Sequence, residues 1–256
     1  MDFHASVLLI GAGILGGAIS ALVGGAAIVT FPALIATGLS PAVATASNLL
    51  ALIPGNFLAS LYDRSQLPPL DRSFVAMMFS SLVGAGIGAV LLLLTPERMF
   101  AALVPVLLAF ATVLFAYAGR ISAWMRKRAA AHDGQANRWA GTVAPLLPVS
   151  IYTGYFGAGA GVMLLGVLSI ATGGDYRSAN VAKNLITSLN SVVAAIIFVV
   201  GDKIAWPASL TMMAGALIGA LIGARLAQVV PREAMRVVVV VVGALLTVLF
   251  ARRYWF

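Results

Sequence analysis

The sequence contains very little charge: 9% of its 256 residues are Asp, Glu, Lys or Arg, whereas 61% are hydrophobic. Soluble domains carry roughly 25% charged residues, so this composition excludes a soluble enzyme, a nucleic-acid-binding domain and a disordered chain. The 16 basic residues outnumber the 8 acidic ones, but they lie mostly between apolar blocks, where basic residues indicate membrane topology. We therefore predict an all-α, polytopic integral membrane protein.

Residues that carry catalytic or metal chemistry are also scarce. Cysteine is absent, which excludes disulfides and thiolate metal sites. The only two histidines are His4, near the N-terminus, and His132, in a basic segment, and the acidic residues fall in expected loops or termini. A membrane-embedded protease needs a nucleophile with a base, or a pair of acids at depth. We therefore expect no enzyme activity, no cofactor and no metal site.

Charge-free blocks give the expected membrane segments. A transmembrane helix needs about 20 apolar residues, so most blocks hold one helix and the first holds at least two. These lengths predict a multi-pass protein of the cell inner membrane. The blocks are 5–62, 73–96, 99–119, 139–174, 184–201, 204–224 and 237–251.

The sequence contains an internal repeat. Residues 77–96 and 212–231 are identical at ten of twenty positions when aligned at an offset of 135. At an offset of 136, Gly38 aligns with Gly174 and Asn48 with Asn184. Repeats of this length indicate duplication of a structural unit. We predict two homologous transmembrane repeats of about four membrane segments each, at 1–119 and 139–256.

A basic segment at 120–138 separates the predicted repeats. It contains five Lys or Arg residues and one acid, Asp133. By the positive-inside rule it is expected to be a cytoplasmic loop. Opposite charge bias in equivalent loops favours an inverted relationship between the repeats, although Arg252 and Arg253 at the C-terminus favour a parallel one.

Each repeat begins with a segment too long for one straight helix. Residues 5–37 and 139–172 would form helices of about 50 Å at 1.5 Å per residue, whereas the hydrocarbon core is only about 30 Å thick. Glycine clusters interrupt both segments, around Gly24 and Gly25 in the first and Gly159 and Gly161 in the second. We predict broken or re-entrant helices, because paired interruptions in two repeats are typical of a transporter's binding site.

Lys183 is the candidate binding residue with the clearest signal. It lies within an apolar region that is otherwise free of charge, and a charge inside a membrane usually faces a cavity or a partner. A lysine can also extend its ammonium to the membrane surface, so this simpler explanation stays open. Its neighbours Asn184 and Asn190, together with Thr45, Ser47 and Asn48 in the first repeat, complete a polar set that could instead hold helices together.

These features together suit a small anion. Glycine-rich breaks expose backbone N–H groups at helix N-termini, where the helix dipole favours negative charge, and Lys183 adds a positive charge. By contrast, Gly215, Gly219 and Gly223, spaced four residues apart, fit a helix-packing stripe.

The residues of both breaks resemble those of a known family. The runs GGAISALVGGAAIVTFPALIATGLSPAVATASNLLALIPGN and GYFGAGAGVMLLGVLSIATGGDYRSANVAKNLITSLN are similar to the sulfite exporter TauE/SafE family of membrane transporters. The resemblance spans nearly the whole chain and departs where Leu168 stands opposite Pro32. It implies transport of small sulfur oxyanions or organosulfonates, often outward.

The sequence thus predicts a secondary transporter, and specifically an exporter, of a small anion such as sulfite, a sulfonate or a related sulfur oxyanion. Its expected partners are that anion and the lipid bilayer, without nucleic acid, and a homo-oligomer is possible. A channel-like pore and a non-transporting membrane subunit are the alternatives. The expected substrate-binding residues are Gly24, Gly25, Thr45, Ser47, Asn48, Gly159, Gly161, Lys183, Asn184 and Asn190.

Overall fold

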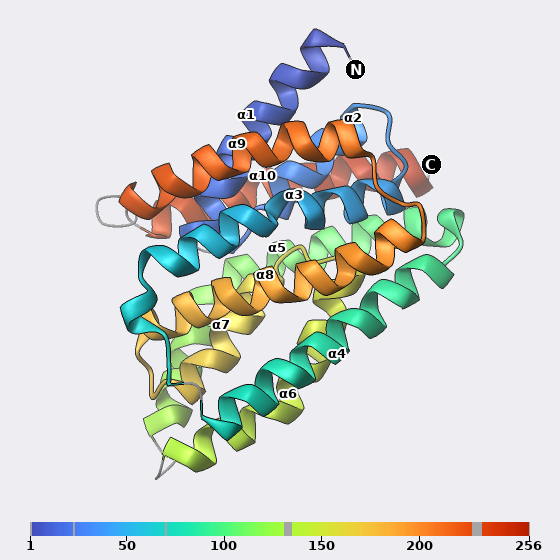
Figure 1. The fold of residues 1–256 in the computed structure, drawn as a ribbon. Coiled ribbons are helices and arrows are strands. Elements are labelled where there is room, and N and C mark those ends of the chain that lie inside the picture. Colours follow the sequence, from blue (N-terminus) through green and yellow to red (C-terminus); the bar gives the residue numbers. More distant parts are fainter. Residues whose placement is uncertain (1, 23, 70, 131–134, 227–231, 256) are drawn as a thin grey trace.

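The computed structural model describes residues 2–22, 24–69, 71–130, 135–226 and 232–255, and these residues form a bundle of α-helices (Figure 1). Seven of the helices found there are long and apolar enough to cross a membrane, namely α1, α3, α4, α5, α8, α9 and α10. The protein is therefore a multi-pass helical membrane protein. The helices are α1 Phe3–Leu22, α2 Ala27–Ala36, α3 Pro41–Tyr62, α4 Arg72–Leu94, α5 Glu97–Ala130, α6 Gln135–Tyr155, α7 Ala160–Ala171, α8 Tyr176–Val200, α9 Trp206–Leu226 and α10 Arg232–Trp255, with a short 3-10 turn at Arg64–Gln66.

The segment predicted as a basic loop is largely helical. Helix α5 continues to Ala130 and α6 begins at Gln135, so most of the 120–138 segment extends two membrane helices. The basic residues that suggested a loop do not end α5, because Arg, Lys and Ala are good helix formers. Residues 131–134 of this segment lie outside the described part of the chain.

Both oversized segments are divided into two helices. The first consists of α1 and the 10-residue α2, and the second of α6 and the 12-residue α7. At 1.5 Å per residue, α2 and α7 are about 15–18 Å long, roughly half the thickness of the hydrocarbon core. Neither can cross a membrane alone, and each forms a hairpin with the helix before it.

Helices α3 and α8 run antiparallel through the centre. The C-terminal end of α3 contacts the start of α8 through Asp63 and Arg177, and Ser47 near the other end of α3 binds Ala205, just beyond α8. Since α2 leads into α3 and α7 leads into α8, the α1–α2 hairpin returns to one end of the bundle and the α6–α7 hairpin to the other (Figure 1).

Each hairpin packs against a helix from the other half of the chain. A Cβ atom at Gly223 of α9 would lie 2.7 Å from the Ala18 Cα of α1, and one at Gly84 of α4 would lie 2.8 Å from the Leu147 oxygen of α6. Such approaches exclude side chains, so the predicted glycine stripe of α9 does pack helices. These contacts leave the broken ends of both hairpins together in the middle of the bundle.

An aromatic cluster holds the bundle beside the breaks. The Phe31 ring of α2 lies 5.3 Å from that of Phe156 and 6.0 Å from that of Phe250 in α10. Phe100 of α5 joins them through Phe156 at 6.2 Å. These ring contacts hold α2 and the residue that follows α6 against α5 and α10.

Candidate functional site

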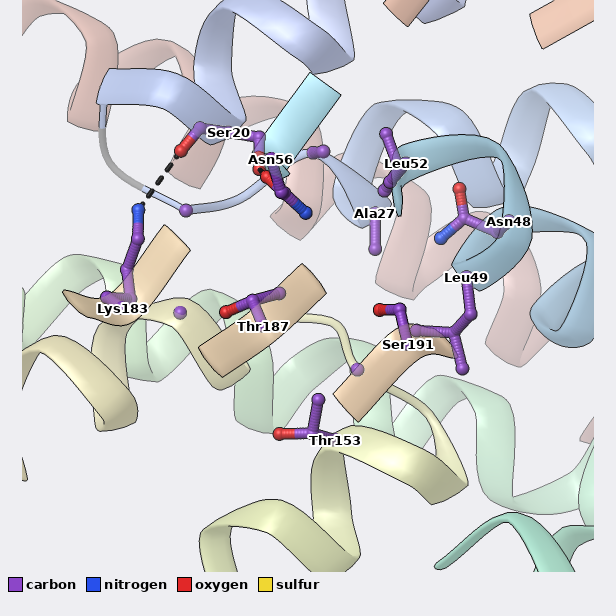
Figure 2. Close-up of a pocket in the computed structure, with 14 residues that line it drawn as sticks. Ser20, Ala27, Asn48, Leu49, Leu52, Asn56, Thr153, Lys183, Thr187 and Ser191 are labelled. Atoms are coloured by element: carbon purple, nitrogen blue, oxygen red, sulfur yellow. Dashed lines mark hydrogen bonds between the residues drawn. The ribbon is translucent and has the colours of Figure 1, made fainter. Parts of the chain in front are cut away.

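A small cavity lies where the two helix breaks meet α3 and α8 (Figure 2). Its volume is about 30 Å³, and since one water needs about 10–15 Å³, it has room for roughly two waters. Its residues come from both halves of the chain and include hydroxyl, amide and ammonium groups. They are Ser20, Gly24, Ala26, Ala27, Asn48, Leu49, Leu52, Asn56, Thr153, Gly157, Gly161, Lys183, Thr187 and Ser191.

Lys183 is the buried cation of this cavity. Its exposed fraction is 1%, and it is the only charged residue among the buried ones that the structure describes. Its Nζ donates a hydrogen bond of 3.1 Å to the Ser20 carbonyl oxygen (Figure 2). The ion pair found in the described chain lies elsewhere, between Asp63 and Arg177. An ammonium has three donors, so Lys183 retains hydrogen-bonding capacity, and no carboxylate of the described residues pairs with it.

Helix α8 holds the C-terminal end of α1. Lys183 binds the Ser20 carbonyl, and three residues earlier the Asn180 amide nitrogen donates to the Ala21 oxygen at 3.4 Å. The last carbonyls of a helix lack intrahelical partners and carry partial negative charge. They therefore attract the ammonium and partly offset its charge, which places Lys183 beside the break of α1.

The two breaks contact each other next to this ammonium. Gly24 has a left-handed backbone with φ of 85°, and a Cβ atom built there would lie 3.3 Å from Lys183 Nζ. A Cβ atom at Gly161 would lie 2.6 Å from the Gly24 carbonyl oxygen. Both positions thus require glycine, the first because of its conformation and the second because of the close approach.

The short helices direct their N-termini into the cavity. Ala27 begins α2, Gly161 lies in the first turn of α7, and both residues line the cavity. The first N–H groups of a helix have no intrahelical partner, and the helix dipole makes this end positive. Two helix N-termini and one ammonium therefore face the same small space, an electrostatic environment that favours an anion.

The structure brings four of the predicted site residues together at the cavity: Gly24, Asn48, Gly161 and Lys183. Gly25 and Gly159 face α5 instead, where added Cβ atoms would meet the Phe115 ring at 2.5 Å and Ala111 at 3.0 Å.

The remaining predicted residues have other surroundings. Thr45 donates to the Pro41 carbonyl of its own helix, and Ser47 accepts a hydrogen bond of 2.9 Å from the Ala205 N–H. Asn190 connects α8 to Ser81 of α4 and Ser150 of α6. Asn184 is buried beside Lys183 with an unpartnered Oδ1, but it does not line the cavity.

Ser20, Thr153 and Ser191 line the cavity although the sequence did not single them out. A signal was available for two of them, because Ser20 and Thr153 each lie four residues before a glycine of an interrupted segment, Gly24 and Gly157. The cavity also contains Asn56, which accepts a 2.6 Å hydrogen bond from the Ser20 hydroxyl. Within the described residues, His, Asp and Glu form no group suited to binding a metal.

A helical scaffold with two broken helices that meet at a central polar cavity is typical of a membrane transporter. The sequence matches the family model described as "Sulfite exporter TauE/SafE" over residues 9–250, and the chain belongs to this family. No solved structure matches the chain significantly.

Curated relatives agree with this assignment. The chain is 27% identical over 255 residues to the "Probable membrane transporter protein YfcA" of Escherichia coli, covering 96% of this chain and 90% of the relative. It is 25% identical over 229 residues to a "Probable membrane transporter protein" of Haemophilus influenzae, covering 90% and 88% of the two chains. The "Probable membrane transporter protein ORF9" of a Sinorhizobium species is 25% identical over 251 residues, with coverages of 97% and 93%.

Proposed function

We propose that the protein is a secondary transporter that exports a small anion such as sulfite, a sulfonate or a related sulfur oxyanion. The observation that carries this proposal is the buried Lys183 ammonium, which faces a cavity with no carboxylate in its lining. Burying an unpaired charge is costly, so the site is suited to a ligand that brings the missing negative charge. The family name supports a sulfur oxyanion.

The cavity offers neutral donors for the oxygens of such an anion. Thr187 lies one helical turn after Lys183, and its hydroxyl is buried without a partner. Ser191 follows one turn later, and Asn48 and Thr153 lie nearby (Figure 2). Hydroxyl and amide groups satisfy the remaining oxygens without adding charge. Because the cavity holds about 30 Å³, it is expected to widen when the anion enters.

We further propose that the halves are an inverted duplication that alternates access to this site. The antiparallel course of α3 and α8 supports inversion, because Asn48 and Asn184 are equivalent in the repeat. We assign the end with the basic 120–138 segment to the cytoplasm. Both termini then lie at the opposite side of the membrane (Figure 1).

Thermal unfolding of the purified protein tests the binding step. A ligand at 100 times its Kd stabilises the native state by about 2.7 kcal/mol, so sulfite, sulfate, ethanesulfonate and chloride can be ranked by the shift in Tm. We expect Lys183→Met to remove the shift caused by the best anion. Lys203→Met, which removes a lysine outside the central cavity, is the matched control and should keep the shift. An unchanged shift in Lys183→Met would contradict the proposal.

The membrane potential is the proposed driving force. One charge crossing about 100 mV gains roughly 2.3 kcal/mol, and an anion leaves a cell that is negative inside without needing a coupling ion. In proteoliposomes loaded with sulfite, a potassium–valinomycin potential should set the efflux rate at fixed pH. Efflux that followed a pH gradient and ignored the potential would instead indicate proton coupling. Saturation of the flux distinguishes a transporter from a pore.

A further inference from the structure

A polar stripe on α8 leads from the cavity to the surface of the bundle. Arg177, Asn180 and Lys183 follow one another at intervals of three residues, so each step along the axis is about 4.5 Å. On the facing helix α3, Asn56, Ser60 and Asp63 follow with similar spacing. Residues three or four apart share one face of a helix. The Asp63–Arg177 ion pair joins the outer ends of the two rows, and Asn56 and Lys183 at their inner ends both line the central cavity. We call the two rows together the polar seam.

An ion pair closes the outer end of this seam. The Arg177 Nη2 donates to Asp63 Oδ1 at 3.0 Å, and its Nε binds the second carboxylate oxygen. It is the only ion pair found among the described residues, and 67% of the Arg177 side chain is exposed. The contact joins an exposed guanidinium to an Asp63 side chain that is 21% exposed, and its two-point geometry is the one by which arginine binds oxyanions.

The Asp63 carboxylate accepts hydrogen bonds from two N–H groups of the Arg177 guanidinium, as a free oxyanion would. Arginine binds carboxylates and other planar or tetrahedral oxyanions through two parallel N–H groups. A dissolved oxyanion at this surface therefore competes with Asp63 for the same two donors. Arg177 is exposed enough to meet it, and it lies at the end of the stripe that leads to Lys183.

Asn180 lies between the two cations on the stripe. Its Oδ1 is buried without a partner, and its amide nitrogen makes a long hydrogen bond of 3.4 Å to Ala21. The side chain is thus weakly held, and rotation of its amide turns the NH2 group toward an anion in the seam. Arg177, Asn180 and Lys183 form three successive donor positions.

We propose that Arg177 is a second substrate-binding residue, at which a small oxyanion displaces Asp63 before it moves along α8 to Lys183. This inference rests on the proposed function and adds an entry site to it. Displacement of Asp63 frees the end of α3 from the start of α8, so the same contact that captures the anion also opens the seam. The site lies at the end of the bundle assigned to the cytoplasm, where an exporter takes up its substrate.

Transport kinetics of substituted proteins test this entry site. Inside-out membrane vesicles expose the proposed cytoplasmic end, and initial uptake of radiolabelled sulfite gives KM and the maximal rate. We expect Arg177→Gln to raise KM about tenfold, and Arg177→Lys to raise it less because the charge remains. Asp63→Asn should lower KM severalfold, since it removes the competing carboxylate. Arg64→Gln, in the adjacent turn, is the matched control and should leave KM unchanged.

The opposite shifts in KM distinguish substrate capture from a structural ion pair. A purely structural pair predicts that Asp63→Asn and Arg177→Gln act in the same direction, with equal losses of Tm, and this result would overturn the entry site. Unchanged KM in both variants would also overturn it. Vesicles with wild-type protein and with Lys183→Met are compared in the same assay. If the wild-type and the Lys183→Met vesicles both take up no more sulfite than vesicles without the protein, the proposed function fails. If uptake is lost only in Lys183→Met, the proposed function stands, and the Arg177 variants then test the entry site separately.

Discussion

At one end of the α3–α8 pair, Asp63 and Arg177 form an exposed ion pair, and polar residues continue inward to Lys183. At the other end, beyond Asn48 and Ser191, the buried residues are uncharged and mostly apolar, such as Ala44 on α3 and Ala194 and Phe198 on α8, and the hydroxyls of Thr45 and Ser47 are engaged in hydrogen bonds. We call these the polar end and the apolar end. Lys183 lies toward the polar end, and Asn48 lies toward the apolar end (Figure 2).

The two ends oppose the passage of an anion in different ways. At the polar end, an anion exchanges one charged partner for another and can remain hydrogen-bonded. At the apolar end, it would have to lose its hydration without compensation, which is far more costly. Outside Phe198 lies a second cavity of about 230 Å³, lined by residues that include Glu97 and Lys203. The two ends thus differ in what separates the central cavity from the surface: an ion pair at the polar end and packed side chains at the apolar end.

Separating the two helix breaks should have the largest effect, because their contact positions Lys183 beside the polar end. In Gly161→Val the new Cβ would lie 2.6 Å from the Gly24 oxygen and 2.8 Å from its Cα. We expect both sulfite transport and sulfite-induced thermal stabilisation to be lost. Gly11→Val is the control, because its Cβ would meet nothing within 4 Å. Equal losses in both variants would show that the junction has no special role.

Opening the apolar end should have the next largest effect. Phe198 is fully buried and lines the outer cavity, and replacing a buried Phe by Ala typically costs about 3–5 kcal/mol. We expect Phe198→Ala to unfold at a lower temperature and to let anions leak through proteoliposomes without saturation. Phe198→Leu should preserve the barrier. A tight Phe198→Ala protein would place the barrier elsewhere.

Loss of the Ser47 hydroxyl should loosen the apolar end without opening it. Ser47→Ala leaves the partly buried Ala205 N–H without its acceptor, at a cost of about 1–3 kcal/mol. Hydrogen exchange at the turn between α8 and α9 should become faster, while exchange near Arg177 should not change. Thr45→Ala, which removes a hydroxyl bound within its own helix, provides the comparison. Faster exchange at both ends would show that the ends are not independent.

Asn190 should have the smallest effect on the anion. Its amide joins α8 to Ser81 and Ser150 and does not line the cavity. We expect Asn190→Ala to lower Tm, while the sulfite affinity stays within about twofold of the wild-type value. A large loss of affinity at unchanged Tm would return Asn190 to the binding site.

The sequence was most informative at positions where a residue type is rare because burying it in a membrane costs much free energy. A lysine inside an apolar block is expensive, and the structure places Lys183 in the cavity. Segments too long for one span, with glycine clusters in the middle, predicted the helix breaks that the structure shows between α1 and α2 and between α6 and α7. Both predictions follow from chemistry that holds whatever the surrounding fold.

Residue type alone did not decide which polar or glycine residues face the cavity. Gly25 and Gly159 lie against α5, and Ser47 binds the turn after α8, because the rotation of each helix about its axis depends on its neighbours. Asp63 and Arg177 are separated by 114 residues, so no local pattern indicated their contact. The spacing of Arg177, Asn180 and Lys183 can be read from the sequence, but only the structure shows that Arg177 meets Asp63 and that Asn180 and Lys183 meet the end of α1.

The glycine contacts between hairpins and scaffold helices also affect the order of assembly. Helix α6 meets α4, which precedes it in the chain, whereas α1 meets α9, with Ala18 and Gly223 separated by 205 residues (223 − 18). At about 5–20 residues per second, ribosomes need roughly 10–40 s to make this intervening chain. During biosynthesis α1 therefore waits in the bilayer with its close-packing face covered only by lipid, while α6 finds its partner as soon as it inserts. All residues that line the central cavity, the last of which is Ser191, have therefore been made before α9 packs against α1.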